Sequence, residues 1–196
     1  IGMMLENNRH FLEIVWAAQR AGLIFTPVST HLTHNETAYI MQNCRAKLFI
    51  GSHALAGVAG ELRDELPAVQ HFYMVGGIIP GFESWGTTGQ PKGVYVAPPE
   101  HDVNTPPMVA VLIGPLFGFG EETVYLSPAP LYHAAPLHYC MGTTYNGGTI
   151  VVMEKFEAEQ ALRLIEEHRI THSQWVPIMF VRMLKLPPEV REAYDV

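Results

Sequence analysis

Short apolar runs alternate with amphipathic segments along the first 80 residues. The runs read GMML, LIFTPV, AKLFIG and HFYMVGG, and the segments between them are long enough to be helices. This alternation is typical of strand-helix-strand units built around a parallel sheet. We therefore expect strands near Leu23 to Val28 and near Lys47 to Ile50.

Three helices are expected between these strands. The first places Phe11, Leu12, Val15 and Trp16 on one face and ends at Gly22. The second begins at the THNE segment, where Thr33 and Glu36 have the spacing of a capping box. The third reads ALAGVAGELRDEL and stops before a proline. The HFYMVGG run then completes three rounds of strand and helix.

The same alternation resumes in the second half. NTPPMVAVLIGPLFG predicts a helix whose early prolines lie in its first turn, and strands are expected at Tyr125 to Ser127 and at Thr149 to Val152. A later helix carries a one-sided stripe made of Ala161, Leu162, Ile165 and His168. The predicted fold class is α/β, with two adjoining lobes of largely parallel sheet and flanking helices. We place their boundary near Gly120 to Glu122, which gives lobes 1–121 and 122–196.

Composition narrows the class of protein. Hydrophobic residues make up 48% of the chain and charged residues 16%, which suits a buried α/β sheet. The formal net charge of -7, with no basic cluster, argues against nucleic-acid binding. Cys44 and Cys140 fit no motif spacing and are expected to be buried, reduced thiols of a cytoplasmic protein, although a disulfide stays open. No signal peptide or membrane span is expected, and Ile1 suggests a start upstream.

The segment GTTGQPKG holds the most informative residues. Its glycines let backbone N–H groups approach oxygen atoms, its two threonines supply hydroxyl donors, and its lysine supplies a mobile cation. Each charge-assisted hydrogen bond of this kind is worth roughly 1.5 to 3 kcal/mol. The order differs from a Walker A loop, because a proline precedes the lysine and a glycine follows it. From spacing alone, a phosphate-binding loop and an ordinary glycine-rich turn are both open.

GTTGQPKGV resembles the phosphate-binding signature of the adenylate-forming enzymes, the superfamily of acyl-CoA synthetases, luciferases and peptide-synthetase adenylation domains. LSPAPLYHAAPLHY and the stretch from GGTIVVM to FVRML resemble later parts of the large N-terminal domain, and AAQRAGLIFTPV resembles an early part. The resemblance covers nearly the whole chain. It is nearest to the fatty-acid and aryl-acid CoA ligases.

The resemblance implies a reaction in two steps: a carboxylate attacks the α-phosphate of Mg²⁺-ATP, and the thiol of CoA then displaces AMP. The implied cofactors are ATP, Mg²⁺ and CoA, and the implied partner is a small-molecule carboxylic acid. The loop would embrace the β- and γ-phosphates through a set of eight residues, namely Gly86, Thr87, Thr88, Gly89, Gln90, Pro91, Lys92 and Gly93. A homodimer, and contact with a membrane surface for a long-chain acid, are left open.

Two further sites are expected. By the resemblance, His133 would lie at the carboxylate; the alternative is a buried histidine bonded to the backbone. Trp175, Val176 and Pro177 follow a predicted strand, where open α/β sheets bind ligands, and are candidate walls of the acyl pocket; the alternative is core packing. The other histidines lack a full ligand set, so no metal site is expected.

The chain also departs from the family pattern. The segment PGFESW runs directly into Gly86, and nothing in it resembles the apolar strand that leads into the family's loop. Our hypothesis is that a linker and strand of about 20 residues is omitted between Trp85 and Gly86; the alternative is a genuine deletion. The Tyr-Gly-x-Thr-Glu segment, the ribose-binding Asp and the C-terminal lysine domain are not found, so we expect this polypeptide alone to be inactive. The alternative function is a non-catalytic nucleotide-binding or interaction module.

Overall fold

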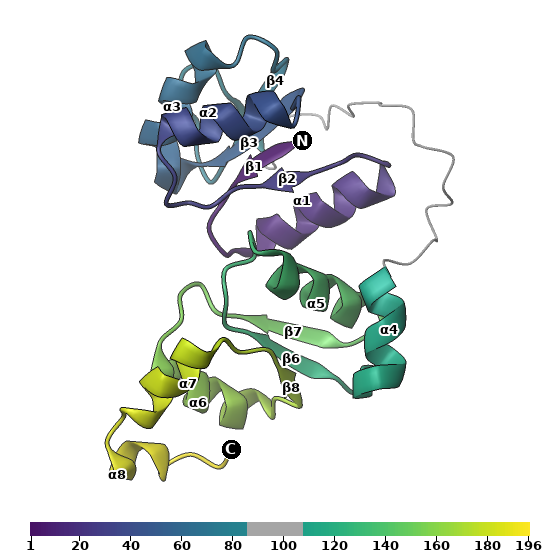
Figure 1. Ribbon diagram of the computed structural model, residues 1–196, viewed down its shortest axis with the longest axis vertical. Coiled ribbons are helices and arrows are strands. Elements are labelled where there is room, and N and C mark those ends of the chain that lie inside the picture. The colour runs from purple at the N-terminus through teal and green to yellow at the C-terminus, as the bar shows by residue number, and fades with distance from the viewer. Residues whose placement is uncertain (86–107) are drawn as a thin grey trace. The chain divides into compact units, whose positions relative to one another are not determined.

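The computed structural model describes residues 1–85 and 108–196 (Figure 1). The chain divides into two compact units, Ile1–Thr105 and Pro106–Val196. Each is an α/β unit with a parallel sheet, which confirms the predicted fold class.

The first unit holds a five-stranded sheet in the order β2-β1-β3-β4-β5, with every pair parallel. Its elements are β1 Gly2–Met4, α1 Arg9–Arg20, β2 Thr26–Pro27, α2 His34–Asn43, β3 Leu48–Ser52, the 3₁₀ helix η1 His53–Leu55, α3 Ala56–Glu65, β4 His71–Val75 and β5 Glu83–Trp85. Helices α2 and α3 lie on one side of the sheet and α1 on the other (Figure 1). Because successive crossovers run in opposite directions from β1, the chain reverses between β1 and β3.

The apolar pattern of each helix decides which face it buries. In α1 the buried residues are Phe11, Ile14, Val15 and Ala18, whereas Leu12 and Trp16 are only half-buried. The prediction was therefore right for Phe11 and Val15 and wrong for Leu12 and Trp16. Ile14 and Ala18 complete the buried stripe in their place, three and seven positions after Phe11. The other side of the sheet carries a second core, in which Phe49 and Phe72 pack with tilted rings whose centroids lie 6.2 Å apart.

The predicted capping box of α2 is confirmed. Glu36 N donates to Thr33 Oγ1 at 3.4 Å, and Thr33 N donates to Glu36 Oε2 at 2.9 Å. The Thr33 backbone N–H and the Thr33 hydroxyl, which also donates to Glu36 Oε2 at 2.8 Å, hold the pKa of the Glu36 carboxyl below its usual value. Helix α3 ends at Glu65, before Pro67, as expected. The strand expected at Leu23 to Val28 is reduced to Thr26–Pro27, because only these residues pair with β1.

One sequence prediction in this unit is wrong. The segment before the glycine-rich loop does contain a strand, since β5 pairs with β4 and places Glu83 beside Tyr73 and Trp85 beside Val75. Among the described residues β5 lies at the edge of the sheet, and its three residues form no apolar run that would indicate a strand. The sequence ESW therefore forms a strand that its composition does not reveal.

The second unit holds a three-stranded parallel sheet in the order β7-β6-β8. Its elements are α4 Met108–Phe117, β6 Val124–Ser127, α5 Ala134–Tyr145, β7 Thr149–Val152, α6 Ala158–His168, β8 His172–Ser173, α7 Pro177–Leu184 and α8 Pro188–Arg191. The predicted strands are confirmed as β6 and β7, and β3 in the first unit agrees with the expected strand near Lys47 to Ile50. In α6, Ala161 and Leu162 are buried, whereas His168 is exposed. His168 is the last residue of α6 and does not extend the stripe.

Helix α4 belongs with the second unit, whereas the sequence placed it in the first lobe. It packs against α5, where Gly142 lies against Ala110 and Ile113. Asn146, which caps α5, donates to Ala110 O at 2.9 Å and to Gly142 O at 2.8 Å. These contacts explain why the division falls between Thr105 and Pro106 and not near Gly120 to Glu122.

Candidate active-site residues

The glycine-rich loop, Gly86 to Gly93, lies outside the described residues, and so do the roles expected of Thr87, Thr88, Gly89, Gln90, Pro91 and Lys92. The described chain reaches Trp85 at the end of β5. In a parallel sheet the carboxyl ends of all strands share one edge, which is where open α/β sheets bind ligands. Strand β5 therefore ends at that edge of the first sheet.

The remaining candidates lie at the carboxyl edge of the second sheet. Strand β6 ends at Ser127 and β8 ends at Ser173, and the two are paired in parallel. The chain passes from β6 to β7 on one side and then returns past β6 to β8 on the other. The crevice of such a reversal lies between β6 and β8, beyond their carboxyl ends. His133 and Trp175 come from the two segments that follow these strands.

His133 occupies the N-cap position of α5. Its backbone N–H donates to Pro130 O at 3.1 Å, and its carbonyl accepts from Leu137 N at 3.3 Å. The side chain is exposed and makes no capping hydrogen bond, and its ring lies 4.6 Å from that of Tyr132. The alternative of a buried histidine bonded to the backbone therefore does not describe this residue.

The position of His133 also suits an anionic group. The first turn of α5 contains no acidic residue, and the N-terminus of a helix carries partial positive charge from unpaired N–H groups. A carboxylate beside the imidazole would meet both. This arrangement can orient an acid, and the imidazole stays reachable from solvent.

Trp175, Val176 and Pro177 differ in their surroundings. Trp175 is half-buried, with ring centroids 6.1 Å from Phe156 and 5.9 Å from Phe180, and it packs on the core beneath α6 and α7. Val176 is 47% exposed, and Pro177, also exposed, starts α7. Core packing thus accounts for one side of Trp175, while the next two side chains remain free to meet an apolar ligand.

The second unit also buries two polar side chains that the sequence analysis did not single out, Tyr125 and Ser127, together with Cys140. Ser127, Tyr125 and Cys140 are all at most 1% exposed, between β6 and α5. Burial raises the pKa of the Cys140 thiol to about 11, with the neighbouring Ser127 hydroxyl offsetting part of the rise, and burial also raises the pKa of Tyr125. Cys140 is therefore a neutral packing residue, as expected. Cys44, in contrast, is exposed, because it caps α2 at the surface.

Several histidines have structural partners in place of ligand sets. His34 bridges α2 and α3, with Nδ1 2.6 Å from Glu61 Oε2 and Nε2 3.5 Å from Glu65 Oε1. His172 Nε2 lies 2.8 Å from Phe117 O, and its Nδ1 lies 2.8 Å from Thr171 Oγ1. Within residues 1–85 and 108–196, no group of three His, Cys, Asp or Glu side chains could hold a metal ion. Nor does any helix in these ranges have the length and apolarity to cross a membrane.

Comparison with known proteins identifies the family of this chain. The sequence profile of the AMP-binding enzyme family matches residues 1–76 and 85–196. The chain therefore belongs to the AMP-binding enzyme family, the adenylate-forming superfamily. The match is interrupted just before the glycine-rich loop.

Individual relatives agree with this family. The chain is 26% identical over 196 residues to a 2-succinylbenzoate–CoA ligase of Geobacillus sp. (strain WCH70), covering 94% of this chain and 39% of that protein. It is 33% identical over 101 residues to the chloroplastic/peroxisomal 2-succinylbenzoate–CoA ligase of Arabidopsis thaliana, covering 52% of this chain and 17% of the relative. The fold is similar to that of the amide bond synthetase McbA of Marinactinospora thermotolerans, with a TM-score of 0.79 at 17% identity, covering 99% of this chain and 42% of McbA. The chain thus spans about two fifths or less of these proteins.

Proposed function

We propose that the full-length protein is an ATP-dependent, AMP-forming carboxylic acid–CoA ligase. In the first step a carboxylate oxygen of the acid forms a bond to the α-phosphorus of ATP, and pyrophosphate leaves. In the second step the sulfur of CoA attacks the acyl carbon, AMP leaves with the bridging oxygen, and the thiol proton goes to solvent. Membership of the AMP-binding family and the CoA ligases among the relatives support this reaction.

The observation that carries the proposal for this chain is the placement of His133. Its exposed imidazole stands at the N-terminus of α5, on the carboxyl edge of the sheet, with Trp175 and Val176 on the segment after the neighbouring strand β8. We assign His133 to orienting the carboxylate of the acid. We assign Trp175, Val176 and Pro177 to the apolar part of the same substrate.

The nucleotide is assigned to Gly86 to Gly93. Backbone N–H groups of the glycines, the hydroxyls of Thr87 and Thr88 and the ammonium of Lys92 would neutralise the β- and γ-phosphate oxygens. Such chemistry depends on positioning and charge neutralisation more than on covalent participation of the protein. Mg²⁺ is expected to arrive with ATP. The described residues do not form a set that fits the ion, so no step is assigned to it.

The rest of the proposal concerns the protein's setting. The 196-residue chain on its own is proposed to be inactive, since it spans only part of its relatives. A cytoplasmic location, a homodimer and contact with a membrane surface in the case of a long-chain acid are proposals as well. The length of the acid stays open, because part of the pocket wall is expected from segments beyond this chain.

Exchange of labelled pyrophosphate into ATP tests the proposed activity. The full-length protein should catalyse exchange only when a suitable carboxylic acid is present, and it should form the acyl-CoA thioester when CoA is added. ATP binding without acid-dependent exchange, over a panel of aryl and fatty acids, would instead support the non-catalytic nucleotide-binding module.

A further inference from the structure

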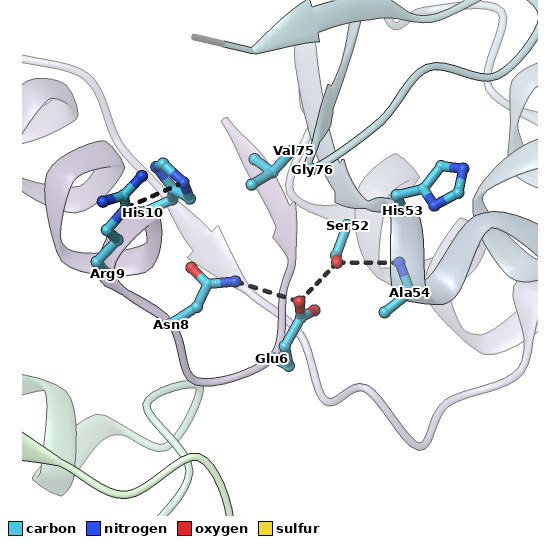
Figure 2. A pocket seen from close by; sticks show the side chains of 9 residues that line it. All are labelled: Glu6, Asn8, Arg9, His10, Ser52, His53, Ala54, Val75 and Gly76. Atoms are coloured by element: carbon cyan, nitrogen blue, oxygen red, sulfur yellow. Dashed lines mark hydrogen bonds between the residues drawn. The ribbon is translucent and has the colours of Figure 1, made fainter. Parts of the chain in front are cut away.

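A cavity of about 450 Å³ lies at the carboxyl edge of the first sheet and contains none of the residues assigned to ATP or to the acid. It opens where the chain reverses between β1 and β3, the place where open α/β sheets bind ligands. Figure 2 shows the start of α1 on one side, the end of β3 on the other and the end of β4 behind. The volume is within the usual range for small-molecule sites, about 300 to 1,000 Å³.

The floor of the cavity is a fixed carboxylate. Glu6 Oε1 accepts hydrogen bonds from Ser52 Oγ at 2.8 Å and from Asn8 Nδ2 at 3.2 Å (Figure 2). Ser52 is 1% exposed, and its hydroxyl also accepts from Ala54 N at 3.2 Å. Glu6 Oε2 is shielded from solvent and has no hydrogen-bond partner among the described residues. Glu6 is therefore held in place by Ser52 and Asn8, and Oε1 is the oxygen with hydroxyl and amide partners.

The rim of the cavity is basic. Arg9, His10 and His53 line it, in a chain whose formal net charge is -7. Arg9 and His53 are exposed, and Arg9 Nε donates to His10 Nε2 at 3.5 Å. Glu13 Oε2 lies 2.8 Å from His10 Nδ1 at the surface. The first turn of α1, a helix of 12 residues, contains no acid, so its N-terminus adds to the attraction for an anion.

The two ends of the cavity therefore select different groups. The Glu6 carboxylate can only accept hydrogen bonds. Its partners in the protein, a hydroxyl and an amide, are both neutral donors, so we expect neutral hydroxyl groups of a ligand to bind at this end. The guanidinium of Arg9 pairs with the oxygens of a phosphate. We propose that this cavity binds a small phosphate ester with free hydroxyl groups, of the size of a pentose phosphate. The hydroxyls meet Glu6, and the phosphate lies toward Arg9 and His53.

Calorimetric titration of the 196-residue chain with ribose 5-phosphate tests this site. We expect one saturable site per chain, with inorganic phosphate and free ribose each binding at least about tenfold more weakly. Glu6→Gln and Arg9→Ala should each weaken binding of ribose 5-phosphate by about tenfold or more. Two matched controls, Glu167→Gln on an exposed part of α6 and Arg20→Ala at the other end of α1, should leave the affinity unchanged.

Three outcomes would overturn the proposal: no saturable binding, equal affinity for inorganic phosphate alone, or affinity that is unchanged in both Glu6→Gln and Arg9→Ala. Arg9 is exposed, so its variant keeps the test decisive if Glu6→Gln unfolds, and thermal unfolding monitors both. Lys92→Ala separates this site from the proposed ATP loop. Binding of ribose 5-phosphate should survive that substitution, and its loss there would place the ligand in the loop and contradict the cavity site.

Discussion

Asn146 donates a 2.9 Å hydrogen bond to the backbone carbonyl of Ala110, which ties the end of α5 to the first turns of α4. The same amide donates to Gly142 O at 2.8 Å, so both of its hydrogens are used. Helix α4 is the first described element after the glycine-rich loop. The Asn146 side chain thus joins α4 to α5 within the second unit.

Asn146→Ala should destabilise the protein by about 1 to 3 kcal/mol, because it leaves Ala110 O without this donor in a half-buried contact. The free energy of unfolding in urea measures the loss. Asn43→Ala, at the exposed end of α2, is the matched control and should change stability little. Equal stability of the two variants would mean that the α4–α5 connection does not depend on Asn146.

Gly142→Ala should cost about 1 to 3 kcal/mol by overpacking, because a methyl group there would meet Ile113 and Ala110, both at most 2% exposed. Gly57→Ala is the control, since a methyl group at this α3 position meets no atom within 4 Å. That control should be neutral or stabilising by up to about 1 kcal/mol, as a helical glycine is replaced by alanine. Thermal unfolding of the two variants should therefore shift in opposite directions, or shift downward for Gly142→Ala alone.

The buried thiol of Cys140 makes stability depend on alkaline pH. Its pKa is raised from 9 to about 11 in the folded protein, so the folded state keeps the proton longer than the unfolded state. Unfolding then releases protons between pH 9 and pH 11, and the stability that the neutral thiol provides is lost over that window, by about 1.4 kcal/mol per pH unit at most.

The comparison of wild type with Cys140→Ala isolates this contribution from other titrating groups. The free energy of unfolding of wild type should fall more steeply than that of the variant between pH 9 and pH 11. Parallel pH profiles would show that Cys140 ionises equally in the two states. Cys44 serves as the internal contrast, because its exposed thiol should react with a thiol reagent in the folded protein before Cys140 does.

Local sequence signals predicted most of the fold. The spacing of Thr33 and Glu36 predicted the start of α2, and the apolar runs predicted β3, β6 and β7. These signals are local, because each depends on a few consecutive residues. Strand β5 was missed, because it is defined by its pairing with β4 and its own three residues carry no strand signal. Which side chains meet at the ends of the strands depends on the order of the strands in the sheet. That order cannot be read from a short stretch of sequence.

The candidate sites show the same division. The resemblance identified Lys92 and His133 as candidates because each lies in a contiguous sequence motif. It did not predict that His133 is an exposed residue at the N-cap of α5. The pairing of Glu6 with Ser52 joins residues 46 positions apart. The available signal was polar residues directly after two apolar runs, namely Glu6 to Asn8 and Ser52 to His53. It becomes informative only once β1 and β3 are known to be neighbours.

The junction between Trp85 and Gly86 remains a prediction. The profile of the family matches residues 1–76 and 85–196, so the match is interrupted close to the place where the loop begins. We expect the parent gene to encode about 20 further residues, ending in an apolar strand and two hydroxyl residues, between these two positions. Sequencing the transcript across this point decides the matter, and an uninterrupted Trp-Gly codon pair would leave a genuine deletion as the explanation.

Pyrophosphate exchange by variants of the full-length protein tests the central claim most directly. Lys92→Ala should slow acid-dependent exchange about 10- to 150-fold, the equivalent of one charged donor lost from the polyphosphate. His133→Ala should instead change the dependence on the acid and leave the apparent affinity for ATP nearly intact. Lys155→Ala and His138→Ala, two exposed positions in the second unit, are the matched controls and should behave as wild type. Exchange that is equal to wild type in both Lys92→Ala and His133→Ala would contradict the proposed roles, even with the fold unchanged.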